Sequence, residues 1–209
     1  MSTRFRRGSF GVLIILSLIM TGVFQTGALA QDAPSQIGPV IPPASACTVE
    51  PRTAEELVAL FANTTPTEPM PFATTETITI GKPADTASAE QVTALIYQAV
   101  ACLNAGDFGR FFALLTDHAI VTIFPWVAEE LATEEAAAQK LAPSPPPANF
   151  LTTILGIGSI ALLPDGSFSA VLVQLDPNAG DQPTALILTA VEQDGAWLID
   201  NAIDFAASE

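Results

Sequence analysis

The segment from residue 90 to residue 116 constrains the fold of this chain more than any other, because it has the pattern of two amphipathic helices broken at one corner. In its first half, apolar residues recur at helical spacing, at Val92, Leu95, Ile96, Ala99, Cys102 and Leu103. Asn104-Ala105-Gly106 then supplies a C-terminal stop signal. Asp107 is placed to cap a second helix, whose apolar residues are Phe108, Phe111, Phe112 and Leu115. The pattern therefore predicts a long helix and a short one that meet at residues 104–107.

The N-terminus has the pattern of an export signal. Three arginines within the first seven residues precede an uncharged apolar run over residues 10–24, and Ala28-Leu29-Ala30 offers the small residues of a cleavage site. The alternative is an uncleaved membrane anchor, but the apolar core is about 15 residues long and a spanning helix needs roughly 20. We therefore predict that residues 1–30 are a signal peptide and that the mature protein is exported, extracellular or in the cell envelope, with no membrane association.

The charge of the mature chain is strongly negative. Cleavage would leave four basic residues against 22 acidic ones, a net charge of −18. The four basic residues are scattered along the chain, whereas phosphate binding needs them clustered, so nucleic acid and anionic membranes are excluded as partners. The sequence contains no EF-hand motif or dense Asp/Asn run, so no metal or other cofactor is predicted.

The mature chain contains two cysteines, Cys47 and Cys102. Export makes a disulfide between them the favoured interpretation, and the bridge would tie the N-terminal segment to the central helix. The alternative is two separate thiols, one of them buried as a small apolar residue. Zinc would need more ligands than two cysteines and the single histidine provide.

The chain before the central helix is predicted to consist of a flexible leader over residues 31–46 and an N-terminal arm over residues 47–87. Thr53-Ala54-Glu55-Glu56 is a capping box that predicts a short helix within the arm. The Thr/Ile alternation of residues 73–81 indicates a strand or an extended strap. Ser88 with Gln91 is predicted to open the central helix.

The C-terminal half combines one more helix with β structure. Residues 119–124 (AIVTIF) are predicted as a strand, and the alanine-rich residues 128–142 as a helix. Two hairpins follow, over 150–175 and 184–205, with turns at Pro164-Asp165-Gly166 and Asp194-Gly195.

The last strand indicates how the sheet is oriented. Simple alternation puts Trp197, Ile199, Ile203 and Phe205 on one apolar face, and Asp200 and Asp204 on the other. Helices followed by an antiparallel meander with one apolar face are typical of an α+β domain.

Short motifs in this region resemble the nuclear transport factor 2-like superfamily, which includes the SnoaL-like proteins. The segment LNAGD at residues 103–107, the segment ALLTDHA at 113–119 and the ending DGAWLIDNAIDF at 194–205 carry the resemblance. It covers residues 88–205, within a SnoaL-like domain placed at 88–209. It implies a cone-like fold, in which helices pack on a strongly curved antiparallel sheet around an apolar pocket. It also implies a homodimer formed through the open sheet face.

The catalytic residues of the superfamily do not carry over to this chain. In ketosteroid isomerase-like members, the positions of the pocket tyrosine and of the base carboxylate correspond here to Ala99 and Ile123, which cannot transfer protons. Tyr97, the only tyrosine, lies two residues earlier and is expected to face elsewhere. Trp126 and Trp197 are expected in a pocket lining or, more simply, in the core.

Asp117 and His118 are the remaining candidates for acid–base catalysis. The competing interpretation makes them polar turn residues before a strand, and adjacent strand residues point to opposite faces. Asp107 is better explained as a helix cap.

Three functions stay open at this point. The favoured one is a non-catalytic exported module that binds an apolar small molecule or an envelope partner, because an apolar sheet face occurs without convergent ionisable groups. The second is a lyase, isomerase or cyclase acting on a hydrophobic substrate, which would need Asp117, His118 or an acid from the last strands, such as Asp200, in the pocket. The third is assembly alone, with the pocket filled by side chains.

Overall fold

A computed structural model of the chain describes residues 39–64, 81–125, 127–177, 180 and 182–205. All of them belong to one compact unit, Ala33–Glu209. The predicted signal peptide, most of the strap predicted over residues 73–81 and Trp126 lie outside the described residues. Within these residues, no helix combines the length and the apolar character needed to cross a membrane.

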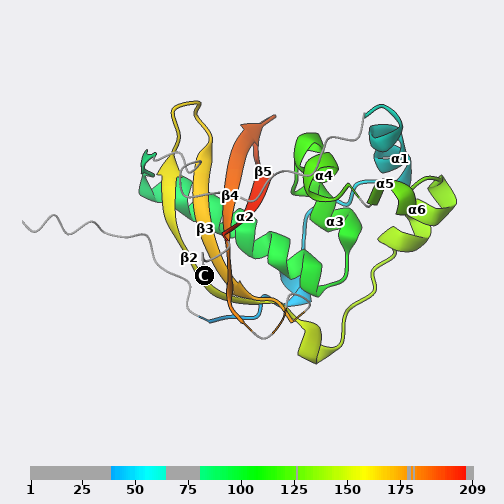
Figure 1. The fold of residues 1–209 in the computed structure, drawn as a ribbon, viewed down its shortest axis with the longest axis horizontal. Helices are drawn as coiled ribbons and strands as arrows, with labels where there is room; N and C mark the ends of the chain where they lie inside the picture. Colours follow the sequence, from blue (N-terminus) through cyan, green and yellow to red (C-terminus); the bar gives the residue numbers. More distant parts are fainter. Residues whose placement is uncertain (1–38, 65–80, 126, 178–179, 181, 206–209) are drawn as a thin grey trace, which may run out of the picture. The chain divides into compact units, whose positions relative to one another are not determined.

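The described helices come mainly before the sheet in the chain (Figure 1). They are α1 (Ala54–Ala62), α2 (Thr86–Asn104), α3 (Phe108–Ala113), α4 (Asp117–Ile123), α5 (Val127–Glu130) and α6 (Glu134–Leu141). Two single turns of 3₁₀-helix are η1 (Ala44–Ala46) and η3 (Ala148–Phe150). The long helix α2 runs diagonally across the sheet, and α1 packs against α6 on the side of β5 that is away from the other strands (Figure 1).

The sheet is antiparallel, and its strands follow one another in chain order. They are β1 (Lys82–Pro83), β2 (Thr153–Leu162), β3 (Phe168–Leu175), β4 (Thr184–Gln193) and β5 (Ala196–Phe205). The predicted α+β class and the two predicted hairpins, β2–β3 and β4–β5, are confirmed. The sheet is not closed, because β1 and β5 form its two edges, and the cone-like shape stays a prediction.

The corner between α2 and α3 forms as the sequence predicts. Gly106 has a φ of +61°, and a Cβ atom there would clash with the carbonyl oxygen of Ser144, so the position requires glycine on two grounds. The Gly106 N–H donates to the Leu103 carbonyl over 2.9 Å, which ends α2. The Asp107 carboxylate accepts the Arg110 N–H at 3.0 Å and so begins α3.

The start of α2 differs slightly from its prediction. The cap is Asp85, whose carboxylate accepts both the backbone N–H of Ser88 at 2.9 Å and its hydroxyl at 2.8 Å. Ser88 is therefore the third residue of the helix and not its start. The capping box of α1 is confirmed, since the Thr53 hydroxyl accepts the Glu56 N–H and the Glu56 carboxylate accepts the Thr53 N–H.

Residues 119–123 belong to the helix α4, and the strand predicted over residues 119–124 is wrong. The Thr116 hydroxyl accepts the Ala119 N–H at 3.0 Å and caps α4. The helix buries Ala119 and Ile120. The β-branched run from Ile120 to Ile123 favours a strand locally, but tertiary packing outweighs that preference.

The single helix predicted over residues 128–142 is also wrong, because the segment contains two short helices, α5 and α6. Between them, Leu131 turns completely into the core. Thr133 then caps α6 by accepting the Ala136 N–H at 3.2 Å.

The core lies between α2 and one face of the sheet. The predicted apolar face of α2 is buried, with Ile96 only 1% exposed, and it belongs to the same hydrophobic core as the buried β2 residues Ile154 and Ile157. The described residues 39–64, called the N-terminal segment from here on, join the same core. Val40 pairs with Ile154, and the Leu57 side chain is fully buried.

The predicted alternation in β5 is wrong beyond Asp200, because a β-bulge interrupts the strand. Ile199 pairs with Ala190 and the next pair is Asn201 with Thr189, which leaves Asp200 as an extra residue. Asp204 consequently shares the inner face with Ile199, and Ile203 lies on the outer face. The prediction for Phe205 lies outside the described side chains.

Candidate functional site

An apolar cavity of about 210 Å³ lies between the helices and the inner face of the sheet. Its helical wall comes from α2, α3 and the end of α4, and its opposite wall from β3, β4 and β5. Thirteen of its fifteen lining residues are apolar: Ile96, Ala99, Val100, Leu103, Phe111, Leu115, Ile123, Phe124, Leu172, Leu186, Leu188, Ile199 and Ala202.

Burial gives the cavity a floor and a mouth. Ile96, Leu115 and Leu172 are each at most 3% exposed and form the floor. The half-buried apolar lining residues border the mouth, and they come from both walls: Leu103, Ile123 and Phe124 from the helical side, and Leu186 and Ala202 from the sheet. The floor is therefore shielded from water, while the mouth is open to it.

Two polar side chains line the cavity at its mouth, Gln174 and Asp204. Gln174 is half-buried and lies at the C-terminal end of β3, and Asp204 is exposed and lies at the C-terminal end of β5. Register places them at the same end of the sheet, because Asp204 pairs with Leu186, and Leu186 pairs with Leu172, two residues before Gln174. A ligand that filled the apolar part would meet these two groups as it reached solvent.

The predicted catalytic candidates, Asp117 and His118, do not line this cavity. Both are exposed in the first turn of α4 and line a separate surface groove. The Asp117 carboxylate forms an ion pair with Arg52 at 2.5 Å, and Arg52 also donates to the Leu115 carbonyl at 2.9 Å. The structure thus gives Asp117 a link to the N-terminal segment, and brings neither residue to the apolar cavity.

Asp200 has a structural role beside that groove. The Thr116 hydroxyl donates to the Asp200 carboxylate at 2.7 Å, and the backbone of residues 114–116 pairs with Ile199. These bonds hold the start of α4 to the bulge of β5. The bulge that turns Asp204 inward is therefore anchored from the helical layer.

The positions compared with ketosteroid isomerase-like proteins do face the cavity. Ala99 and Ile123 both belong to its lining, and Tyr97 does not. At these two positions the cavity has only hydrocarbon, which cannot transfer a proton. Trp197 packs edge-on against Phe168, with ring centroids 5.1 Å apart, and lies outside the lining.

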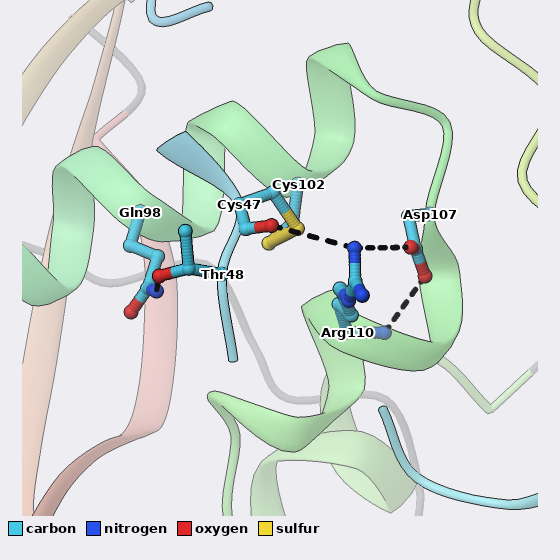
Figure 2. Close-up of a disulfide and its surroundings, with 6 residues drawn as sticks. All are labelled: Cys47, Thr48, Gln98, Cys102, Asp107 and Arg110. Carbon is cyan, nitrogen blue, oxygen red and sulfur yellow. Dashed lines mark hydrogen bonds and ion pairs between the residues drawn. A yellow bond between two sulfur atoms is a disulfide. The ribbon is translucent and has the colours of Figure 1, made fainter. Parts of the chain in front are cut away.

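The disulfide joins Cys47 to Cys102 of α2, as the favoured interpretation predicts (Figure 2). Beside it, Arg110 donates to the Cys47 carbonyl at 3.5 Å and pairs with Asp107 at 3.6 Å. The bridge is compatible with an oxidising, exported location. Among the described residues, no group of three His, Cys, Asp or Glu side chains is placed to hold a metal ion.

Comparison with family models, curated proteins and solved structures finds no match for this chain. The resemblance to the nuclear transport factor 2-like superfamily therefore stays a prediction. The site has to be interpreted from its own residues.

Sequence reasoning missed Asp204 as a cavity residue. Strict alternation assigns it to the outer face, and only the extra residue at Asp200 reverses that assignment. Within the last strand, the polar pair Asp200-Asn201 interrupts the apolar pattern, and this was the one local signal of a β-bulge.

Proposed function

We propose that this protein is an exported, non-catalytic module that binds an apolar small molecule in the cavity between α2 and the sheet. The observation that carries the proposal is the lining itself, which is apolar from its floor to its half-buried rim and has polar groups only at one end. Binding pockets for small molecules are concave and mostly apolar, with few polar groups. The disulfide and the N-terminal pattern support export.

The size of the cavity limits the ligand. A cavity of about 150 Å³ in an engineered lysozyme, lined by similar side chains, binds benzene. At about 210 Å³, this one accommodates a single ring with a short side arm or a short alkyl chain. Larger ligands would have to extend through the mouth.

The alternative function as a lyase, isomerase or cyclase has less support. It needs Asp117, His118 or an acid of the last strands such as Asp200 in the pocket, and none of these three is among the cavity-lining residues. The acid of the last strand that does line the cavity is Asp204, which is exposed at its mouth. Ala99 and Ile123, at the positions expected to be catalytic, are aliphatic. The resemblance to SnoaL-like domains is consistent with the preferred proposal, because that superfamily also contains modules without catalysis.

Filling the cavity tests the proposal. We expect Ala99→Leu to abolish binding of small aromatic compounds, measured by calorimetry, because the larger side chain occupies the space of the ligand. The variant should unfold at the same or a higher temperature than the parent, since cavity filling stabilises proteins. Ala87→Leu is the matched control, because it makes the same change at an exposed position of α2.

The same experiment can overturn the proposal. Binding that is equal in the parent and in Ala99→Leu would place the ligand elsewhere. Native mass spectrometry of the exported protein provides an independent check, because a retained non-protein mass that disappears in Ala99→Leu would identify the natural ligand class.

A further inference from the structure

At the mouth of the cavity, a carboxylate lies next to an apolar interior. This arrangement restricts the chemical class of the ligand, whereas the shape of the cavity restricts only its size. Among the described residues that line the cavity, Asp204 is the only one with a charged side chain. It shares the inner face of the sheet with Leu186 and Ile199, so its carboxylate stands at the edge of hydrocarbon.

No positive charge compensates Asp204 within the lining. Of the four basic residues outside the predicted signal peptide, none lines the cavity. Arg52 is paired with Asp117, and Arg110 lies beside the disulfide. A ligand carboxylate at the mouth would therefore meet Asp204 and a strongly acidic protein without a cationic partner.

We propose that the cavity selects an apolar amine, with its hydrocarbon part inside and its protonated nitrogen at Asp204. This inference rests on the proposed function and adds the chemical class of the ligand. An ammonium group offers three N–H donors, which the Asp204 carboxylate and the Gln174 side-chain carbonyl can accept. The apolar floor supplies affinity for the hydrocarbon part, and the mouth discriminates by charge.

The magnitude of that discrimination is modest, because Asp204 is exposed. Ion pairs between exposed groups contribute about 0.2–1 kcal/mol in water. We therefore expect an amine to bind about 1.4- to 5-fold more tightly than an uncharged compound of the same shape. A carboxylate of that shape should bind more weakly than the uncharged compound, because it is repelled.

Three compounds with one hydrocarbon body provide the test: 3-phenylpropylamine, 3-phenylpropan-1-ol and 3-phenylpropanoic acid. Their dissociation constants for the parent protein, measured at low and at high salt by calorimetry, should increase in that order. The preference for the amine should shrink at high salt, because salt screens exposed charges.

Two variants separate Asp204 from the overall charge of the protein. Asp204→Asn should bring the affinity for the amine down to that for the alcohol, so that the ratio of the two dissociation constants approaches one. Asp194→Asn removes one charge at the β4–β5 turn, at the opposite end of the sheet, and should preserve the preference for the amine. Asn is tolerated at that turn, where the φ of Asp194 is +54°.

The outcomes distinguish this inference from the proposed function. If all three compounds bind equally, or the acid binds best, the inference is wrong and the apolar site stands. If none of them binds, the proposed function fails as well. Conversion of any of the compounds by the parent but not by Asp204→Asn would overturn the inference in favour of catalysis by Asp204.

Discussion

The buried side chain of Asn104 joins three segments of the chain that are distant in sequence. Its amide nitrogen donates to the carbonyls of Thr152 at 3.0 Å and Pro42 at 3.3 Å, and its oxygen accepts the Thr152 N–H at 2.8 Å. The asparagine that the sequence suggested only as part of a helix stop thus connects α2 to the N-terminal segment and to the start of β2.

Replacing Asn104 should be costly for stability. We expect Asn104→Ala to lower the free energy of unfolding by about 2–4 kcal/mol, because the N–H and C=O groups of the buried Thr152 lose their partner. Alanine has the highest helix propensity, so the loss cannot come from α2 itself. Chemical denaturation measures it, and Asn149→Ala, at an exposed position, is the control. A cost below about 0.5 kcal/mol would contradict this role.

At the scale of elements, the sequence predicted helix ends and hairpin turns correctly, because the interactions that form them involve neighbouring residues. Thr53 with Glu56, Gly106 and Asp107 predicted helix ends because a cap acts within a few residues. The hairpin turns were predictable for the same reason. Each of these features depends on no more than four consecutive residues.

Two elements could not be predicted, because distant contacts decide them. The run from Ile120 to Ile123 prefers a strand until its burial against the core makes it a helix. The Asp200 residue of the bulge accepts a hydrogen bond from Thr116, which lies 84 residues earlier in the chain. Since that bulge turns Asp204 inward, the polar part of the candidate site was hidden from sequence reasoning, whereas its apolar α2 wall was not.

The helix caps also predict how stability depends on pH. Hydrogen bonds from the backbone and hydroxyl of Thr53 hold the pKa of Glu56 below its ordinary 4.5. Those from the backbone and hydroxyl of Ser88 hold the pKa of Asp85 below 3.8. Because both pKa values are lower in the folded state, the stabilisation is complete above the ordinary values and is lost as the pH falls through the folded ones.

The double variant Glu56→Gln, Asp85→Asn tests this dependence, because both replacements can still form the caps but cannot titrate. Between about pH 6 and pH 3, we expect the denaturation midpoint of the parent to fall more than that of the variant. Glu55→Gln, beside the capping box but outside it, should follow the parent. Parallel curves for parent and double variant would rule out this contribution.

At the scale of the whole molecule, the N-terminal segment is held to the domain by covalent and non-covalent links. Val40 pairs with Ile154 of β2, Arg52 pairs with Asp117, and Cys47 is bonded to Cys102. These links fasten the segment to β2, to α4 and, through the disulfide, to α2, which forms one wall of the cavity. The stability of that wall is therefore coupled to the redox state of the bridge.

Removal of the bridge in Cys47→Ala, Cys102→Ala should destabilise the protein. A disulfide between residues 55 apart restricts the unfolded chain by about 4 kcal/mol in the chain-entropy model. At this chain size, that corresponds to a decrease of roughly 10 °C in the midpoint of thermal unfolding. Reductant should destabilise the parent by a similar amount and leave the double variant unchanged.

Ligand binding by the double variant, which lacks the bridge, then shows whether the bridge affects only the unfolded state or also the geometry of the cavity. If Val40, Asn104 and Arg52 suffice to hold the N-terminal segment, the double variant will bind 3-phenylpropylamine with unchanged affinity below its unfolding temperature, and the disulfide acts only on the unfolded state. If the affinity falls together with the stability, the bridge also maintains the α2 wall in its binding geometry. The cavity would then be competent only in an oxidising compartment, which would connect the proposed site to the predicted export of the chain.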